Sequence, residues 1–515
     1  MDNKSTIPYL AKNEYGVPTL YVEDKPFLIL GGELHNSSAS SLEYMEEEIW
    51  PYVRNQNINT ILLSIAWEDL EPEEGRYDDT LLEGLLQQAR REKIKLILLW
   101  FGLWKNGESY YVPGWVKEDT KRFVRAEYEH CSTSNTVSVF CKEAVEKDKK
   151  AYCHLMNFLK ENDKEHTVIM VQVENEIGIL GAPRDYSAKA NEAFEQDVPM
   201  EVAAQYGVSG KWEDAFGERA CEHFMAYHYA KAIEEIASAG KEIYPIPMYV
   251  NAWLEQHPLR AGVYPSGGPV AGMLPMWQLA APSIDFCAPD IYLPDFRDVC
   301  ESYCVNGNPL FIPETGRNSM SASNVFYVFG KLNGLGFAPF GIEDIFKKER
   351  NQMSENQLSA LNIRKDAFYA DETAPYLRKS YEILTQIWDK LIACRGTDQM
   401  TAFVKQSPNE RGCIIPFEHF DLQLDYLESD AGKPGSGGII FKEDSGFYII
   451  GCNVHFTALP KLGKRAMMSI PRYEEGIFVN GQWKRGRILN GDEVYDMTLR
   501  DMPECKYVRV YEMIL

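Results

Sequence analysis

Short hydrophobic runs recur up to residue 345, and each is too short for a helix and is bounded by turn-forming or polar residues. They are rich in Ile, Leu, Val and aromatic residues, as strands are when both of their faces are buried. The eight runs cover 26–36, 58–67, 95–104, 167–176, 244–253, 284–292, 309–316 and 336–344. The pattern therefore predicts eight fully buried strands.

Amphipathic helical patterns separate most of these runs, at 41–56, 79–93, 143–162 and 218–240. Buried strands that alternate with helices form a parallel sheet with both faces covered, and eight such units favour a closed (β/α)8 barrel, the TIM barrel. An open doubly wound sheet is the alternative. Its dinucleotide-binding form requires GxGxxG after the first strand, where the chain has only Gly31-Gly32, and no phosphate loop of the form GxxxxGK(S/T) occurs.

The pattern changes after a last long helix at 373–393. Runs of alternating apolar and polar residues follow, with turn signals at 433–438 and at Asn480-Gly481. We expect a catalytic barrel with long loop insertions over residues 1–393 and an antiparallel β-domain over residues 394–515. The aromatic content of the second domain is compatible with a structural cap and with a carbohydrate-binding module.

Composition and charge narrow the class of ligand. The chain has 515 residues and a formal net charge of −23, which argues against nucleic acid and anionic membranes as partners because both attract basic surfaces. The start of the chain lacks a signal-peptide pattern, and the longest apolar run, 96–104, is too short to span a bilayer, so we expect a cytoplasmic protein. The 11 cysteines form no CxxC pair and the nine histidines no HExxH or HxH motif, so no metal or cofactor is expected.

Carboxylates, amides and Trp residues dominate the ends of the expected strands. The reacting groups of a TIM barrel lie at these ends, because the loops there form its concave face. Glu176 ends the fourth strand and Glu314 the seventh, on roughly opposite sides of the ring. Glycoside hydrolysis needs two carboxyl groups across a cleft, one to protonate the leaving oxygen and one to attack the sugar or activate water. The sequence therefore predicts Glu176 and Glu314 as the catalytic pair.

The neighbours of the two glutamates suggest separate roles. Asn175 beside Glu176 is suited to hydrogen-bond a sugar hydroxyl, and burial or a nearby carboxylate would raise the pKa of Glu176 so that it acts first as acid and then as base. Glu314 follows Pro313 at the end of an apolar strand and suits the nucleophile. Glu174 is expected to be a structural partner. A single strand-end Glu is more often a helix cap or a solvated loop charge, so the prediction depends on the pair.

Three segments carry more specific motifs, namely WEDLEPEEGRYD (67–78), TVIMVQVENEIG (167–178) and PLFIPETG (309–316). The first resembles the Trp-x-x-x-Glu-Pro-x-x-Gly-x-(Phe/Tyr)-Asp motif of glycoside hydrolase family 35, the β-galactosidase family of clan A, and the other two resemble its acid/base and nucleophile strands. The resemblance covers about residues 20–345, and the tail is similar to the small β-domain of a divergent bacterial branch. It implies a retaining mechanism through a covalent glycosyl-enzyme, with Glu176 as acid/base and Glu314 as nucleophile about 5–5.5 Å apart.

Departures from the family pattern concern the sugar more than the chemistry. Galactose-specific relatives carry Ala-Glu-Trp where this chain has Gly102-Leu103-Trp104, and they carry Tyr near the positions of Ser64 and Asn36. A site built to bond a hydroxyl discriminates strongly, so these changes leave the identity of the sugar open. Other side chains are expected to hold the substrate, although each could equally have a structural role. They are Glu33, His35, Trp67, Trp104, Asn251, Trp253, Tyr292 and Glu343.

We expect a retaining exo-β-glycosidase, most simply β-galactosidase-like, that acts on a soluble oligosaccharide or glycoside. Long loops such as 105–135 and 264–269 would wall the cleft and favour exo action. The alternatives are a β-glucosidase or an oligo-β-glucan transglycosylase on the same scaffold, and a non-catalytic carbohydrate-binding protein. An acidic barrel with an added β-domain is also compatible with a homo-oligomer.

Overall fold

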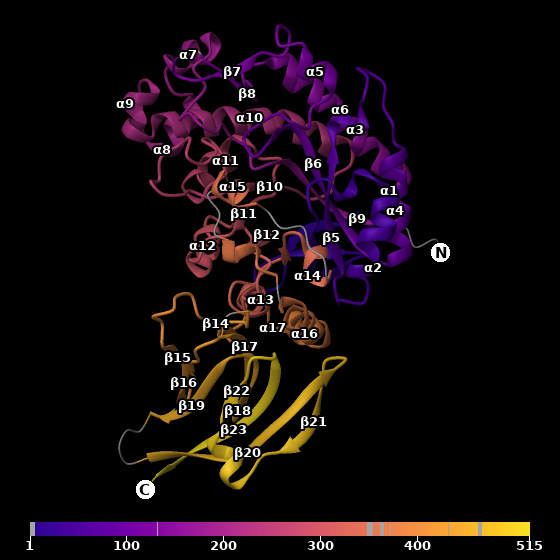
Figure 1. The fold of residues 1–515 in the computed structure, drawn as a ribbon. Helices are drawn as coiled ribbons and strands as arrows, with labels where there is room; N and C mark the ends of the chain where they lie inside the picture. Colours follow the sequence, from indigo (N-terminus) through magenta and orange to yellow (C-terminus); the bar gives the residue numbers. More distant parts are fainter. Residues whose placement is uncertain are drawn as a thin grey trace.

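The molecule has two parts, a barrel wrapped by helices and a pair of antiparallel sheets, which occupy the upper and lower halves of Figure 1. The computed structural model describes residues 6–130, 132–347, 354–360, 365–370, 372–430, 432–461 and 466–514. None of the helices within these ranges has the length and hydropathy of a membrane span.

Eight parallel strands close into one barrel in the order β10-β11-β12-β13-β4-β5-β6-β9. Their side chains are buried along almost the whole of each strand, because helices cover the outside and the side chains themselves fill the inside. The TIM barrel is therefore confirmed and the open doubly wound sheet is excluded. The strands are β4 (Ile29–Glu33), β5 (Thr60–Ala66), β6 (Lys95–Lys105), β9 (Val168–Asn175), β10 (Met248–Trp253), β11 (Phe286–Ile291), β12 (Phe311–Thr315) and β13 (Gly336–Pro339).

Amphipathic helices surround the barrel. The helix expected at 41–56 is instead broken into α1 (Leu42–Tyr44), a π-helical turn and α2 (Trp50–Val53), where Pro51 has no N–H to continue the ladder. The longer helices are α4 (Thr80–Glu92), α6 (Lys142–Asn162), α10 (Ala220–Ile243), α12 (Phe296–Tyr303), α13 (Ser321–Gly330) and α16 (Thr373–Gln386). The short ones are α3 (Trp67–Leu70), α5 (Gly114–Glu118), α7 (Ala188–Phe194), α8 (Met200–Tyr206), α9 (Trp212–Phe216), α11 (Leu274–Ala280), α14 (Ile342–Phe346), α15 (Glu355–Ala360) and α17 (Trp388–Cys394).

Two small antiparallel sheets lie outside the ring of barrel strands. β1 (Tyr9–Lys12), β2 (Pro18–Val22) and β3 (Lys25–Phe27) form the first, and its Leu20 and Val22 pack on the strand residues Ile29, Leu62 and Ile97. The second pairs β7 (Arg125–Glu127) with β8 (Thr133–Val137), which begins in the predicted insertion 105–135 and ends two residues beyond it. The first sheet therefore closes the interior of the barrel at its N-terminal end.

The C-terminal part is an antiparallel β-domain of two facing sheets, as predicted. β16 alternates buried and half-buried residues, and its Leu422 and Leu424 pack with Phe447, Phe456 and Val508 between the sheets. One sheet has the order β14-β17-β18-β23-β20-β21 and the other β15-β16-β19-β22. The strands are β14 (Met400–Val404), β15 (Gly412–Pro416), β16 (Phe420–Tyr426), β17 (Gly437–Glu443), β18 (Gly446–Cys452), β19 (Val454–Pro460), β20 (Ala466–Val479), β21 (Gln482–Ile488), β22 (Thr498–Leu499) and β23 (Glu504–Ile514).

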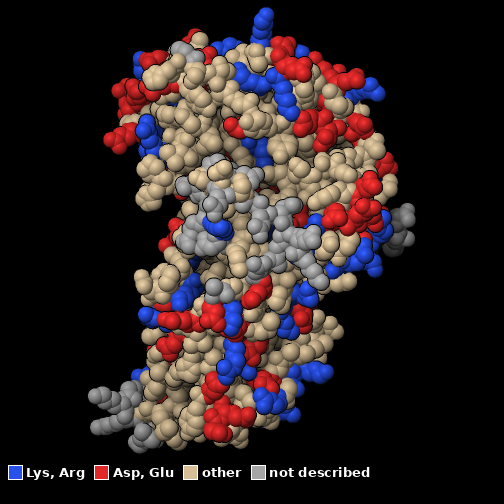
Figure 2. Space-filling view, viewed as in Figure 1, with Lys and Arg blue, Asp and Glu red and all other residues tan. Residues whose placement is uncertain are grey.

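Helices α13, α16 and α17 lie between the barrel and the β-domain (Figure 1). Gly330 at the end of α13 touches Ile439 of β17 and Ala402 of β14, so closely that a Cβ there would lie 2.6 Å from the Ile439 side chain. The boundary expected at 393–394 stays a prediction. On the face shown in Figure 2, acidic side chains are spread over the barrel helices, and acidic and basic side chains are mixed on the β-domain.

Arg395 ties three parts of the chain together just after α17. Its guanidinium donates to the carbonyl oxygens of Pro18 at 2.9 Å, Asn333 at 2.7 Å and Gly334 at 3.0 Å, and the residue is 2% exposed. The N-terminal sheet, the loop before β13 and the start of the β-domain are therefore joined through one buried cation.

We predict that Arg395→Met destabilises the protein by about 3 kcal/mol, because the apolar stem is kept while three inward-facing carbonyls lose their donor. Chemical denaturation of both proteins measures the difference. Arg411→Met is the matched control, since that side chain is 77% exposed and its one ion pair, to Glu428, spans 3.4 Å; it should change stability by less than about 0.5 kcal/mol. Equal effects of the two substitutions would contradict the role given to Arg395.

Candidate active site

A small cavity of 80 Å³ lies at the C-terminal end of the barrel strands, and we name it the mouth cavity. Glu176, just after β9, and Glu314, in β12, both line it, so the structure brings the two predicted glutamates together. Its lining residues are Asn36, Lys105, Asn106, Glu176, Trp253, Leu254, Gln256, Asp290, Tyr292, Leu293, Glu314, Phe340 and Phe368.

Strand register sets the level of the functional side chains. In the parallel pairing of β10, β11 and β12, Trp253 lies opposite Asp290 and Asp290 opposite Glu314. Residues in register on parallel strands point to the same side of the sheet, here into the barrel mouth. Glu33 at the end of β4 is level with Phe340, just past β13. A single layer of the barrel therefore carries most of the polar groups of the site.

The end of β9 departs from regular strand geometry. Glu174 and Glu176 adopt left-handed backbone conformations, with φ of 60° and 46°, which non-glycine residues adopt only at some cost. Because of these two residues, the alternation expected for a strand does not hold, and the two carboxyl groups have different surroundings. Glu176 lines the mouth cavity, while Glu174 is fully buried behind the strand.

Glu174 has a structural role in this arrangement. Its carboxylate accepts hydrogen bonds from the backbone N–H groups of Leu103 at 3.0 Å and Trp104 at 2.7 Å, and it lies against the buried Asp148 of α6. Burial, and then Asp148, raise the pKa of Glu174 well above its usual range. Gly102 makes room for the pair, since a Cβ there would lie 2.4 Å from a Glu174 carboxylate oxygen. The buried pair therefore fixes the end of β6 against that of β9.

Four carboxyl groups gather in the mouth of the barrel, those of Glu33, Glu176, Asp290 and Glu314. Burial is the largest cause of a raised pKa for each of them, and their mutual repulsion adds to it for Glu33, Glu176 and Asp290. Lys105 is the only basic residue among the described residues that line the cavity, and its charge opposes the shifts of Glu33, Glu176 and Glu314. The cluster therefore holds protons at a pH where free carboxyl groups are ionised.

The neighbours of Glu176 and those of Glu314 shift the pKa of the two glutamates differently. Burial, and then the charge of Glu314, raise the pKa of Glu176 to about 7. Burial also raises the pKa of Glu314, but Lys105, the Tyr292 hydroxyl, Glu33 and His35 all favour its ionised form. The Tyr292 hydroxyl donates a hydrogen bond directly to Glu314 Oε1. The surroundings therefore favour a protonated Glu176 facing an ionised Glu314 near neutral pH.

A chain of amide groups holds the acidic side chains in place. Asn251 donates to Asp290 Oδ2 at 2.7 Å and to Asn175 Oδ1 at 3.2 Å, and its own Oδ1 accepts from the backbone N–H of Glu176 at 2.9 Å. Gln172 donates to the same Asn175 oxygen at 2.9 Å. Asn175 and Asn251 are 0% and 1% exposed, so both lie behind the wall of the cavity and orient the residues that line it.

The remaining predicted residues fall into two groups. Trp253 and Tyr292 line the mouth cavity. Trp67 and Trp104 are fully buried and lie outside its lining; their indole N–H groups donate to Glu71 at 2.7 Å and to the Val137 carbonyl at 2.9 Å. The structure therefore places these two indoles in the packed wall of the barrel.

His35 and Glu343 form a support beside the cavity. His35 Nε2 lies 2.7 Å from Asp344 Oδ2, and Glu343 Oε1 accepts from the backbone N–H of His35 at 3.1 Å and from Ser38 Oγ at 2.7 Å. Arg317 contacts both His35 and Asp344, at 3.1 and 2.6 Å. This network joins the loop after β4 to α14.

Sequence reasoning missed several residues of the site. Asp290 carried the same signal as the residues it selected, a carboxylate at a strand end, and Lys105 and Asn106 directly follow the predicted third strand. Phe368 had no such signal, because it comes from a short 3₁₀ turn far along the chain. Its ring stacks on Tyr292, with centroids 5.1 Å apart, and so closes one side of the cavity.

The amide oxygen of Asn36, which lines the cavity, has no hydrogen-bond donor within the described part of the chain. The buried carboxyl groups of Glu33 and Asp290 instead pair with those of Glu314 and Glu176. Buried polar atoms are nearly always satisfied, so an amide oxygen left open beside a cavity points to a ligand with hydrogen-bond donors. Sugar hydroxyl groups have that property.

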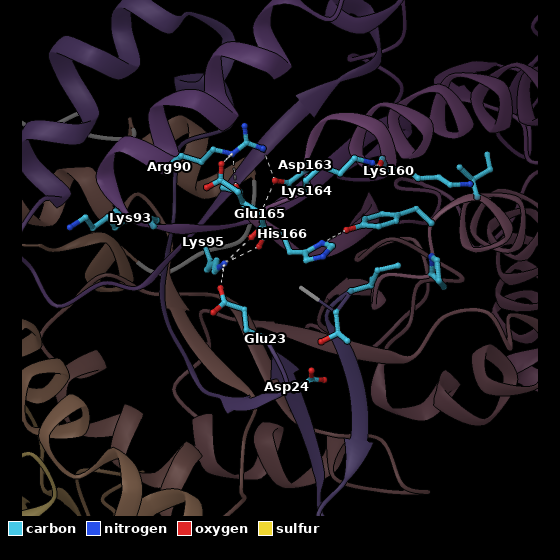
Figure 3. A pocket seen from close by; sticks show the side chains of 17 residues that line it. Glu23, Asp24, Arg90, Lys93, Lys95, Lys160, Asp163, Lys164, Glu165 and His166 are labelled. Atoms are coloured by element: carbon cyan, nitrogen blue, oxygen red, sulfur yellow. Dashed lines mark hydrogen bonds and ion pairs between the residues drawn. The ribbon is translucent and has the colours of Figure 1, made fainter. Parts of the chain in front are cut away.

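A cavity of 1160 Å³ lies at the other end of the barrel, around the starts of β6, β9 and β10 (Figure 3). Its charged residues include two ion pairs, Arg90 with Asp163 at 2.7 Å and Lys95 with Glu23 at 3.2 Å. The N-terminal end of a TIM barrel contributes stability and not chemistry, and these ion pairs fit that role.

Family comparison agrees with the geometry. Residues 19–248 match the family described as "Glycosyl hydrolases family 35", and residues 377–500 match one described as "Domain of unknown function (DUF5597)". The TIM barrel, the buried pair of glutamates at its mouth and this family match together indicate a glycoside hydrolase. Within that class, residues 19–248 are similar to glycosyl hydrolases family 35, as the motifs of the chain indicated, and the C-terminal match fits a divergent branch. The first match ends at the start of β10, so it includes Glu176 but not Glu314.

Two solved structures are similar to this chain at low sequence identity. The β-galactosidase from Bacillus circulans sp. alkalophilus is 9% identical, with a TM-score of 0.51 over 93% of this chain and 99% of that one. The β-galactosidase from the psychrophilic Marinomonas ef1 is 13% identical, with a TM-score of 0.48 over 72% of this chain and 61% of that one, so the chain spans less than two thirds of that enzyme. At such identities a structural likeness speaks for the fold alone. No curated protein sequence matches the chain.

The raised pKa of Glu33 predicts a pH-dependent cost in stability. A carboxyl group that is harder to ionise when folded destabilises the protein above its unfolded pKa, near 4.3, because there the unfolded chain releases the proton more easily. Glu33→Gln removes this cost, so we predict that its melting temperature exceeds that of the parent by about 2 °C at pH 7.5 and equals it near pH 4.

The exposed Glu428 supplies the control for this experiment. Its side chain is 86% exposed, and Glu428→Gln should leave the melting temperature unchanged at both pH values. If Glu33→Gln lowered the melting temperature by the same amount at pH 4 and pH 7.5, the substitution would be acting through packing and the charge argument would be wrong.

Proposed function

We propose that the protein is a retaining exo-β-glycosidase, most simply β-galactosidase-like, with Glu176 as acid/base and Glu314 as nucleophile. The observation that carries the proposal is the buried pair itself, two glutamates in one small cavity, close enough that the charge of Glu314 raises the pKa of Glu176. The opposite influences of their neighbours support the division of roles. The match of residues 19–248 to glycosyl hydrolases family 35 supports the reaction class.

The proposed reaction has two steps at one carbon. Glu314, ionised and held by Tyr292, attacks the anomeric carbon while Glu176 gives its proton to the leaving oxygen, so the glycosidic bond breaks as the glycosyl ester forms. Esterification removes the charge of Glu314, which was the second cause of the raised pKa of Glu176. Glu176 is then a stronger acid and remains ionised, as it must be to take a proton from the water that attacks the ester.

The lining of the mouth cavity and the open amide oxygen of Asn36 support a sugar as the reacting unit. Trp253, Tyr292 and Phe368 make the mouth narrow, which favours entry of one chain end and hence exo action. Leu103, which replaces a family glutamate, is fully buried, and Ser64 donates to the Asn36 carbonyl at 2.6 Å, so neither side chain offers the sugar a contact. This favours a β-glucosidase or oligo-β-glucan transglycosylase as the second candidate. The cytoplasmic location, the homo-oligomer and the non-catalytic alternative stay predictions.

Substitution of each glutamate on substrates with different leaving groups tests the roles. On an unactivated disaccharide we predict a loss of about 10²–10⁴-fold in kcat/KM for Glu176→Gln, because the leaving oxygen needs a proton. On a dinitrophenyl β-glycoside, whose leaving group needs none, Glu176→Gln should lose far less in kcat/KM, whereas Glu314→Gln should abolish turnover of both. The alkaline limb of the parent's profile should have its midpoint near pH 7, where Glu176 ionises.

A panel of nitrophenyl β-galactoside, β-glucoside and β-mannoside, run with the parent and Glu314→Gln, is the companion measurement. If the glucoside were preferred, the sugar would be glucose in place of galactose and the proposed mechanism would stand. Absence of turnover on every β-glycoside, or a Glu314→Gln protein as active as the parent, would overturn the mechanism.

A further inference from the structure

A second cavity, of 490 Å³, lies next to the mouth cavity, between the barrel and the β-domain, and we name it the interdomain cleft. On the barrel side it is lined by residues after β11 and β12 and by parts of α12 and α13. On the other side it is lined by 404–408 and by Glu428, Ser429 and Gly435 of the β-domain. Figure 1 shows the connection after β14 rising toward α12.

Polar contacts hold the two sides of the cleft together. Arg297 of α12 donates to Glu410 at 2.8 Å, and Gln406 donates to Asp298 Oδ2 at 2.7 Å and accepts from the Asp298 backbone at 3.1 Å. The β-domain is therefore fixed at this place relative to the barrel mouth. The volume of the cleft falls within the range of ligand-binding pockets.

The two cavities share a wall. Tyr292 and Leu293 line both of them, and the Tyr292 hydroxyl that bonds Glu314 belongs to the same residue that borders the cleft. An oligosaccharide that extends from the mouth cavity past Tyr292 and Leu293 would therefore enter the cleft.

The chemistry of the cleft suits a neutral, polyhydroxylated ligand. Asn324 of α13 lines it and is only 9% exposed, yet its amide has no hydrogen-bond partner in the described part of the chain. An amide offers both a donor and an acceptor, which is what a sugar hydroxyl requires. Phe296 and Pro408 add apolar surface, Arg297 is paired with Glu410, and the charges of Lys405 and Glu428 are opposite in sign. A strongly charged ligand has no counterpart here.

We propose that the interdomain cleft binds a further sugar unit of the oligosaccharide whose terminal residue occupies the mouth cavity. This rests on the proposed function and extends it, since the β-domain becomes part of the substrate site and the preferred substrate is an oligosaccharide and not a simple glycoside.

Two substitutions in the full chain test this use of the cleft. Asn324→Ala removes the open amide, and Ser407→Trp fills the cleft from the β-domain side, where Ser407 is exposed. The quantity measured is the ratio of kcat/KM on a tetraose, β-1,4-galactotetraose or cellotetraose, to kcat/KM on the matching nitrophenyl glycoside. We expect this ratio to fall about fivefold for Asn324→Ala, the worth of one hydrogen bond, and further for Ser407→Trp. Asn409→Trp, exposed on the same connection but outside the lining, should leave the ratio unchanged.

A binding measurement separates failure of this proposal from failure of the proposed function. Both tetraoses are titrated calorimetrically into Glu314→Gln protein, alone and combined with Asn324→Ala or Ser407→Trp. Weaker tetraose binding in both combined variants supports the cleft even if the parent cleaves no glycoside. Binding that is unaffected by both substitutions, or no binding of either tetraose to Glu314→Gln, overturns it even if the nitrophenyl glycosides are cleaved.

Discussion

The structure depends on one electrostatic constraint, the burial of four carboxyl groups around the mouth cavity. Among the described residues that line this cavity, only Lys105 carries a positive charge that offsets theirs. Such a cluster is unfavourable when fully ionised, so it has to share protons or be held by donors. The barrel supplies both solutions in one layer. Asn251 fixes Asp290 and the backbone of Glu176, and Tyr292 donates to Glu314. Because these donors are divided unequally, the surroundings favour the ionised form more strongly at Glu314 than at Glu176.

This arrangement requires backbone and electrostatic features that are locally unfavourable. Glu174 and Glu176 are held in left-handed conformations, and a second buried acidic pair, Glu174 with Asp148, braces the strand from behind. Gly102 is needed there because a side chain would occupy the space of the Glu174 carboxylate. The residue that replaces the family's Ala at this position therefore belongs to the support of β9, while the neighbouring Leu103 belongs to the core. Both departures from the family's tripeptide thus have structural roles in this chain.

Much of this could be read from the sequence because the physical signals were local. Strands buried on both faces appear as continuous apolar runs, so all eight were found, and a Glu at the end of such a run has few reasons to be there apart from chemistry or capping. The role of Glu174 was also anticipated. Signals that depend on packing were not readable. Trp67 and Trp104 end strands as Trp253 does, yet their indoles turn into the wall, and only Trp253 lines the cavity. Asp290 ends a strand as Glu314 does, but only the packed barrel shows that its carboxyl group enters the same site, and Phe368 reaches the cavity from a turn without any pattern of its own.

The covalent intermediate at Glu314 is the central claim, and its direct capture is the decisive measurement. A 2-deoxy-2-fluoro-β-glycosyl fluoride of the preferred sugar slows both steps but leaves a good leaving group, so the glycosyl-enzyme accumulates. Peptide mass spectrometry after inactivation should then find one fluorosugar per chain, esterified to Glu314. Label on Glu176 or on another residue, or turnover of the unsubstituted glycoside with inversion and no label at all, would contradict the account.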